Sequence, residues 1–261
     1  MSENAFRQAS IVPSSQTTQD VSTAALTIKR EQFIAAMELY NSGKAYKLFD
    51  TAVAITNISL QLYLLYRVMQ FSIGIARQVA AMVAAFVVAD FINGLVHMFM
   101  DQNDDYESIA GPLIANFHLH HKTPRYKKNP LAVVYFNESG SKVWLVGYLA
   151  TVSLLAGASW LNPTVLHILV YTGILSSVAE VSHYLCHSSN AVPARLLAEI
   201  GFLLSKRHHA RHHVQDNTHY AFLNGFTDPL INVIARKYSK GYKNGTDLHY
   251  AHYTAGNPDG R

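Results

Sequence analysis

The chain has 261 residues, of which 49% are hydrophobic and only 15% are charged, which is rich in apolar residues for a soluble domain. The formal net charge is +4, but the lysines and arginines lie beside apolar blocks rather than in a stripe interleaved with aromatic residues. The composition therefore indicates a membrane protein whose basic residues face anionic lipid headgroups, and it argues against a nucleic-acid partner.

The single cysteine, Cys186, excludes an intramolecular disulfide and every zinc site built from several thiolates. We expect Cys186 to fill space between helices. A metal would have to be held by nitrogen and oxygen atoms, and the 14 histidines are the obvious candidates.

The amino-terminal segment, residues 1 to about 20, is rich in Ser, Thr and Gln and lacks the apolar core of a secretory signal, so we expect a disordered tail. A helix at the membrane interface should follow and end at Asn41-Ser42-Gly43. Its apolar face is formed by Leu26, Phe33, Ile34, Met37 and Tyr40. Residues 1–48 are thus expected to form a tail and an interfacial helix.

Apolar blocks predict four transmembrane helices. The first block, residues 51–76, is interrupted by Arg67, and the second, residues 78–100, contains one charge, Asp90. A third block, residues 143–179, has no charged residue, and Asn162-Pro163 near its middle predicts a turn between two spans. The fold class is therefore all-α, with about four transmembrane helices.

Four spans place both termini on one side of the membrane, and the distribution of basic residues makes this the cytoplasmic side or its equivalent. Basic residues of the second connection and of the tail share that side: Lys122, Arg125, Lys127, Lys128, Lys142, Lys206, Arg207, Arg211, Arg236 and Lys237. The turn at Asn162-Pro163 has none.

Most histidines gather on this same side. They are His97 after the second span, then His118, His120 and His121, then His183 and His187 after the fourth span, and His208, His209, His212, His213 and His219 in the tail. His167 lies early in the fourth span, and we expect no metal at His167, His249 or His252.

Three pairs of these histidines are four residues apart, so that on a helix both rings of a pair project from one face: His183 with His187, His208 with His212, and His209 with His213. Neutral imidazole suits iron, copper and zinc, and the set is larger than one ion can use. Two ions are the economical interpretation. No Glu lies between the paired histidines of the tail, as a zinc protease motif would require, so iron and oxygen chemistry is favoured over zinc hydrolysis.

Five segments of the chain resemble the membrane lipid desaturase family, whose members include plasmanylethanolamine desaturase, a plant plastidial phosphatidylglycerol acyl desaturase and bacterial relatives. They are ADFINGLVHMFMD at 89–101, FHLHHKTP at 117–124, SHYLCH at 182–187, KRHHARHH at 206–213 and GFTDPL at 225–230. Their order and spacing cover most of the chain after the first span.

This resemblance implies a di-iron desaturase domain over residues 49–240, capped on the cytoplasmic side by a histidine-rich helical assembly, and a polar tail at 241–261. It implies iron ligation by His97, His120, His121, His183, His187, His208, His209, His212 and His213. It also implies O2 as co-substrate and an external electron donor, cytochrome b5 or ferredoxin. The chain lacks two histidines of the plasmanyl branch, one of them at Gly201, as the plant acyl-lipid branch does. The expected substrate is therefore an acyl chain of a membrane lipid, with an alkyl ether chain as the alternative.

Further residues are candidates for a supporting role around the metal. Asp90 would orient a ligand imidazole or pair with an arginine, and Asp101 lies one turn beyond His97. His118 would either donate a hydrogen bond to a metal ligand or be an exposed residue. Asp228 would either support a metal ligand with its carboxylate or cap the following helix. Gly94 would allow a neighbouring segment to approach closely.

Two alternatives to a desaturase remain open at this stage. A lipid hydroxylase could use the same metal centre, because adding oxygen to the chain after the first hydrogen is removed, instead of removing a second hydrogen, needs only small geometric changes. A non-catalytic metal-binding or metal-transporting protein would place histidines or acids along a path through several spans, whereas only Asp90 and His167 lie deep here.

Overall fold

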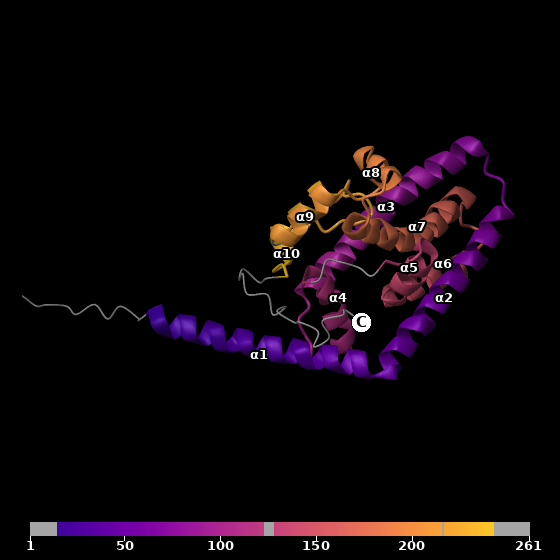
Figure 1. The fold of residues 1–261 in the computed structure, drawn as a ribbon. Helices are drawn as coiled ribbons and strands as arrows, with labels where there is room; N and C mark the ends of the chain where they lie inside the picture. The colour runs from indigo at the N-terminus through magenta and orange to yellow at the C-terminus, as the bar shows by residue number, and fades with distance from the viewer. Residues whose placement is uncertain (1–14, 123–127, 216, 243–261) are drawn as a thin grey trace, which may run out of the picture.

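The computed structural model describes residues 15–122, 128–215 and 217–242, and side chains from residue 25 onward except that of Lys122. These residues form helices joined by short connections (Figure 1). The helices are α1 (Ser15–Ser42), α2 (Lys44–Met69), α3 (Ile75–Gln102), α4 (Gly111–Lys122), α5 (Leu131–Gly140), α6 (Val143–Leu155), α7 (Pro163–Ser188), α8 (Val192–Glu199), α9 (Lys206–Val214) and α10 (Asp228–Tyr238). The predicted all-α fold is confirmed.

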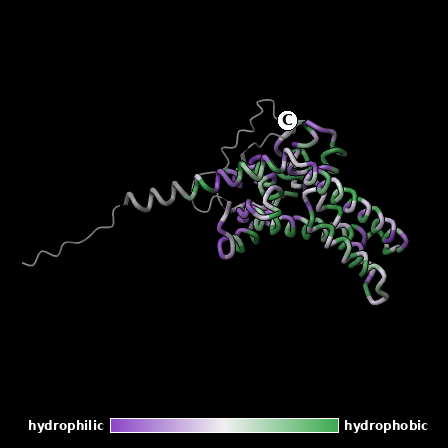
Figure 2. Tube along the Cα trace, turned by 90° about the horizontal axis from the view of Figure 1, so that it is seen from below, coloured by the Kyte–Doolittle hydropathy of each residue, from purple (hydrophilic) through white to green (hydrophobic). Residues whose placement is uncertain are grey.

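Three helices, α2, α3 and α7, are long and apolar enough to cross a membrane, and α6 is a shorter apolar helix. Figure 2 shows hydrophobic residues over much of their length. The 13 residues of α6 span about 20 Å, which is less than the hydrocarbon core of about 30 Å. The turn at Asn162-Pro163 is confirmed, because the Asn162 side chain caps α7 by accepting a hydrogen bond from the Thr164 amide.

The first span lies earlier in the chain than expected. Helix α2 begins at Lys44 and ends at Met69, and Gly74, the residue before α3, has a positive φ of +76° that favours glycine. Arg67 therefore sits in the last turn of the span and not within it. Its guanidinium donates hydrogen bonds to the Tyr63 hydroxyl at 2.8 Å and the Ala156 carbonyl at 3.2 Å.

Helix α1 ends at Ser42, as predicted, and packs its apolar face on α4. Phe33 and Met37 are buried in a cluster with Tyr106, Ile114 and others. The helix begins at Ser15, within the segment expected to be a tail. The rest of that tail, residues 1–14, lies outside the described residues, as do residues 123–127 with Arg125 and Lys127, and residues 243–261 with His249 and His252.

Lys142 lies in the second connection, as expected from the sequence, but it is not exposed there. Its side chain is buried in the connection between α5 and α6. The ammonium group lies 2.9 Å from the Glu180 carboxylate of α7 and donates to the Asn93 side chain of α3 at 2.6 Å. Burial of this cation is tolerated because both partners are present, and the three groups tie α3 and α7 to the α5–α6 connection.

The long helices bring the histidine-bearing segments together. Helices α3 and α7 pack along each other, α10 packs on α3, and α9 contacts α7 (Figure 1). Gly94 permits the close approach expected of it, since a Cβ atom there would lie 2.4 Å from Ile231 Cδ1 of α10 and 3.1 Å from Ala221 Cα. The ends of α3 and α7 thus face α4 and α9.

Candidate metal centre

Two adjoining groups of side chains could each hold a metal ion. The first ligand group consists of His97, Asp101, His120, His121 and His212, from α3, α4 and α9. The second ligand group consists of His183, His187 and His209, from α7 and α9. Within each group, the candidate ligand atoms lie within 4.8 Å of one another. Rings of the two groups approach closely, with centroids of His120 and His183 5.3 Å apart.

The Nε2 atoms of the second ligand group form a triangle. His183 and His209 are 2.9 Å apart, His187 and His209 are 2.9 Å apart, and His183 and His187 are 3.1 Å apart. A neutral Nε2 is either a donor or an acceptor, so at least two of the three atoms are alike and cannot hydrogen-bond to each other. A metal ion satisfies all three, because bonds of about 2.0–2.1 Å place ligands at right angles about 2.9 Å apart.

His213 adjoins the second ligand group. Its Nε2 atom lies 2.9 Å from the Nε2 atom of His209, one helical turn earlier on α9. The structure therefore brings together two of the predicted histidine pairs, as their four-residue spacing indicates. These pairs are His183 with His187 and His209 with His213.

The first ligand group contains buried polar atoms without hydrogen-bond partners among the described residues. They are Nε2 of His97, His120 and His212 and Oδ2 of Asp101. The Nδ1 atoms of these rings donate to backbone carbonyls: His97 to Tyr220 at 2.8 Å, His120 to Phe117 at 2.6 Å and His212 to Thr218 at 2.9 Å. Because a carbonyl only accepts, each neutral ring presents an unprotonated Nε2 to the group, as a metal ligand must.

Asp101 lies inside the first ligand group rather than behind it. Its carboxylate is 2.9 Å from His121 Nε2, 3.3 Å from His212 Nε2 and 3.5 Å from His97 Nε2. A carboxylate in this position can bind a hard cation directly and offsets part of its charge. The first ligand group thus combines nitrogen and oxygen donors, whereas the second has imidazoles alone.

Burial keeps most of the rings outside the spanning helices neutral. It lowers the pKa of His120 to about 4 and also lowers the pKa values of His121, His209 and His213. His212 is the exception: burial has the largest single effect and lowers its pKa, but the Asp101 carboxylate, the Thr218 carbonyl and the Asp228 charge together outweigh burial, so that the pKa is raised. Neutral imidazoles are the form that binds metal, so the site suits metal binding near neutral pH.

The orientation of α9 explains which tail histidines reach the centre. The Ser205 side chain caps this helix by accepting a hydrogen bond from the His208 amide. His209 and His212 are buried beneath it, whereas Arg207 and Arg211 are exposed on its outer face. His208 is rotated about 100° from His209 around the helix axis and does not join either ligand group.

His208 instead contacts Asp228 at the start of α10. Its Nε2 atom pairs with Asp228 Oδ2, and Asp228 Oδ1 accepts a hydrogen bond from the Ala221 amide at 2.9 Å. Gly225, with φ of +83°, lies against the same ring, and a Cβ atom there would be 2.5 Å from His208 Nε2. His208 and Asp228 therefore fix the segment that supplies the Tyr220 carbonyl to His97.

Among the described residues, Asp90 neither contacts a ligand imidazole nor pairs with an arginine. Its carboxylate accepts hydrogen bonds from the amides of Asn224, Gly225 and Thr227 and from the Thr227 hydroxyl. Four donors offset the cost of burying this charge within a span. Asp90 thus anchors the loop before α10 to α3.

His118 is buried, so its exposed alternative is wrong. Its Nε2 atom donates to the Met100 carbonyl at 2.8 Å and its Nδ1 atom accepts from the Tyr106 hydroxyl at 2.7 Å. With both nitrogens engaged, His118 fastens α4 to the end of α3. His167 is similarly engaged with the Pro163 carbonyl at the opposite end of α7.

Sequence reasoning missed several residues that shape the centre. Phe222 packs between the two ligand groups, with its ring centroid 5.4 Å from that of His97 and 5.5 Å from that of His183. The Tyr242 ring stacks on His121 at 4.2 Å. Glu180 Oε2 lies 3.9 Å from His183 Nδ1. The sequence does mark this residue, because Glu180 is the first charged residue after the uncharged block 143–179.

Comparison with known proteins gives one match. The family model of the lipid desaturase domain matches residues 86–236, which is more than half of the chain and includes both ligand groups. Comparisons with curated proteins and with solved structures give no match. With three helices able to span a membrane and two histidine groups at one end of them, the chain belongs to the lipid desaturase family.

Proposed function

We propose that this protein is an O2-dependent di-iron desaturase that introduces a double bond into an acyl chain of a membrane lipid. The carrying observation is the pair of adjoining ligand groups, in which unprotonated Nε2 atoms converge in buried positions. Membership of the lipid desaturase family supplies the reaction class.

Iron is the metal that fits the donors and the reaction best. The donor set is imidazole with one carboxylate, and it contains no thiolate that an oxidant would destroy. When bound, iron supplies the activation of O2 needed to break unactivated C–H bonds. Under this proposal His97, Asp101, His120, His121 and His212 hold one ion, and His183, His187, His209 and His213 hold the other.

The reaction removes two hydrogen atoms from adjacent carbons of the chain. O2 accepts them together with two electrons and two protons, and two water molecules leave. Cytochrome b5 or a ferredoxin would supply the electrons, since no haem-attachment or dinucleotide-binding motif is visible in the sequence. An acyl lipid is the favoured substrate because two histidines of the plasmanyl branch are missing.

The surrounding residues of the chain hold the ligands in place. The carbonyls of Tyr220, Phe117 and Thr218 fix three imidazoles in one tautomer and one orientation. Phe222 contacts both ligand groups and also the polar cluster of Lys142, whose ammonium lies 4.8 Å from the centroid of the ring. We further propose that both termini and the metal centre face the cytoplasm or its equivalent.

Metal content and products of single-histidine variants test this function. His183→Ala and His212→Ala should each abolish loading of the ion held by their group and all desaturation, while the protein stays in the membrane. His167→Ala, at the far end of α7 from the centre, is the matched control and should keep iron and activity. Full iron and turnover in His183→Ala or His212→Ala would contradict the proposal.

Product analysis separates the remaining alternatives. A product lipid with two hydrogen atoms fewer than the substrate identifies a desaturase. A product lipid with one added oxygen atom identifies a hydroxylase. Iron binding without O2 consumption, in the presence of lipid and reductant, would identify a non-catalytic metal protein.

A further inference from the structure

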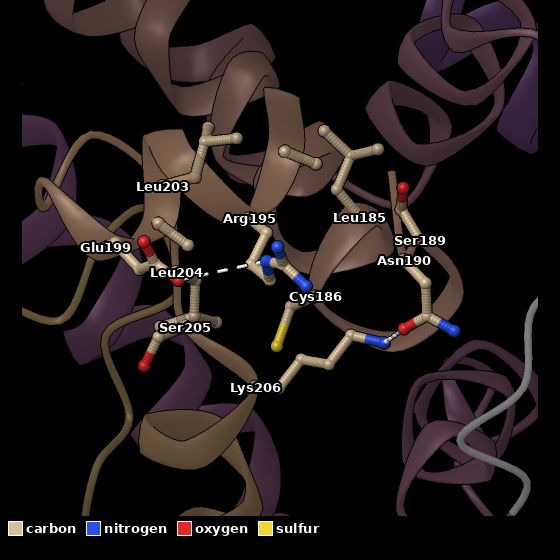
Figure 3. A pocket seen from close by; sticks show the side chains of 12 residues that line it. Leu185, Cys186, Ser189, Asn190, Arg195, Glu199, Leu203, Leu204, Ser205 and Lys206 are labelled. Carbon is tan, nitrogen blue, oxygen red and sulfur yellow. Dashed lines mark hydrogen bonds and ion pairs between the residues drawn. The ribbon is translucent and has the colours of Figure 1, made fainter. Parts of the chain in front are cut away.

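A cavity of about 320 Å³ lies beside the second ligand group and plays no part in the chemistry described above (Figure 3). The end of α7 forms one wall, α8 another, and the connection from α8 into α9 the third. Its size is at the lower end of the range for small-molecule sites, which is roughly 300–1,000 Å³. It has room for a headgroup but not for a whole lipid.

The lining of this cavity is amphipathic. Leu185, Leu203 and Leu204 supply apolar surface, while Arg195 and Lys206 supply two positive charges. Lys206 Nζ lies 2.7 Å from the Asn190 side chain, as the dashed line in Figure 3 shows. Lys206 is also the first residue of α9, so the positive end of that helix dipole faces the same space. The combination suits an anionic group attached to apolar chains.

One acidic residue, Glu199, shares the cavity and competes for Arg195. Glu199 Oε1 lies 3.8 Å from Arg195 Nε, and the two side chains are 62% and 67% exposed. An ion pair this long and this exposed contributes little. A phosphate can therefore displace it and form shorter, bidentate hydrogen bonds to the guanidinium.

Helix α8 places the cavity at the membrane. No residue of α8 is buried, and the side chains of Val192, Leu196 and Leu197 are each 41% or more exposed. Phe202, just after the helix, contacts Phe86 in the uncharged part of the spanning helix α3, with ring centroids 6.0 Å apart. A short helix with exposed apolar side chains beside an arginine is typical of the boundary between headgroups and acyl chains.

We propose that this cavity binds the phosphodiester of a membrane phospholipid through Arg195 and Lys206. This inference rests on the proposed function, because it assigns the headgroup subsite of that reaction. Cys186 lines the cavity directly before His187, and Lys206 lies on the helix that carries His209. A headgroup held here would keep its acyl chains next to the metal centre, and recognition of the phosphodiester leaves the rest of the headgroup variable.

Lipid binding to the full-length protein in detergent tests the proposal without turnover. The probes are phosphatidylglycerol, diacylglycerol with the same acyl chains, and glycerol 3-phosphate, each titrated by native mass spectrometry. We expect Arg195→Gln with Lys206→Gln to weaken phosphatidylglycerol binding at least tenfold and to leave diacylglycerol binding unchanged. Glu199→Gln should strengthen phosphatidylglycerol binding several-fold, because it removes the carboxylate that competes for Arg195. A misfolded variant would bind the lipid more weakly, so stronger binding cannot result from a loss of folding.

The matched control is Arg236→Gln with Lys237→Gln, which removes the same charge from the exposed end of α10. Equal loss of binding in the control and in the Arg195 and Lys206 variant would overturn the proposal, as would no effect in the latter. Glycerol 3-phosphate binding as tightly as the lipid would also overturn it, since the site would then serve a soluble phosphate.

Iron content and desaturation measured on the same samples keep the two proposals distinguishable. Loss of the proposed function would show as absent iron or product while lipid binding still depends on Arg195 and Lys206. Failure of the present inference would show as unchanged lipid binding in a variant that loads iron and desaturates normally.

Discussion

Asp90 and Thr227 are joined twice, although 137 residues separate them in the chain: Asp90 Oδ2 accepts hydrogen bonds from the Thr227 amide at 2.9 Å and the Thr227 hydroxyl at 2.7 Å. The contact connects the buried middle of α3 to the residue before α10. The loop that it holds continues from Tyr220, whose carbonyl orients His97. A carboxylate remote from the metal groups therefore supports one of their ligands.

Asp90→Asn should destabilise the protein by about 1–3 kcal/mol, because an amide offers one acceptor where four donors converge and sets its own NH2 group against them. Thr227→Val removes only the hydroxyl and should cost roughly 1 kcal/mol. Thermal unfolding in detergent measures both. An Asp90→Asn protein as stable as wild type would show that the loop does not depend on this anchor.

His208→Gln and His209→Gln should separate a support residue from a metal ligand. We expect His208→Gln to retain both ions and to lose about 1–3 kcal/mol of stability, since Asp228 loses its partner. His209→Gln should lose the ion of the second ligand group. Iron quantification on purified protein distinguishes the variants. If His208→Gln instead lost iron at unchanged stability, His208 would have to be a ligand.

Gly94→Ala should destabilise the packing of α3 against α10 by about 1–3 kcal/mol, because the new Cβ would meet Ile231 Cδ1. Ile231→Val deletes that atom, so the double variant should recover part of the loss. Recovery would be incomplete because Ala221 Cα remains 3.1 Å from the added carbon. A double-mutant cycle of unfolding measurements gives the coupling, and independent, additive effects would contradict the contact.

The metal-free protein should lose stability as the pH falls from about 6.5 to about 4. The pKa of His120 is lowered to about 4 by burial, so the unfolded chain takes up this proton first. The lowered pKa values of His209 and His213 act in the same direction, while the raised pKa of His212 opposes them.

Thermal unfolding of metal-free protein across this pH range measures the effect, and His120→Asn should reduce its slope. Metal-loaded protein is the control, because a bound ion blocks protonation until it is released. Stability that rises as the pH falls would contradict the neutral state of these imidazoles.

Local features of the sequence predicted the helical fold, the family and most of the histidines that gather in the candidate metal centre. Apolar blocks locate the spans in the chain, because burial in a membrane requires long uncharged segments, but their ends differ from the helix ends by up to nine residues, as at α2 and α7. The spacing of His183 with His187 and of His209 with His213 placed each pair on one helix face, since helix geometry is local.

Only the tertiary structure decided what lies between helices. His208 and His212 are four residues apart, like the other two pairs, yet they have different partners. His208 faces Asp228 and His212 faces Asp101, because packing against α3 and α7 sets the rotation of α9. The partners of Asp90 and the buried environment of Lys142 likewise come from residues distant in the chain. Residue identity reveals that a buried charge needs partners, but long-range packing determines which partners it finds.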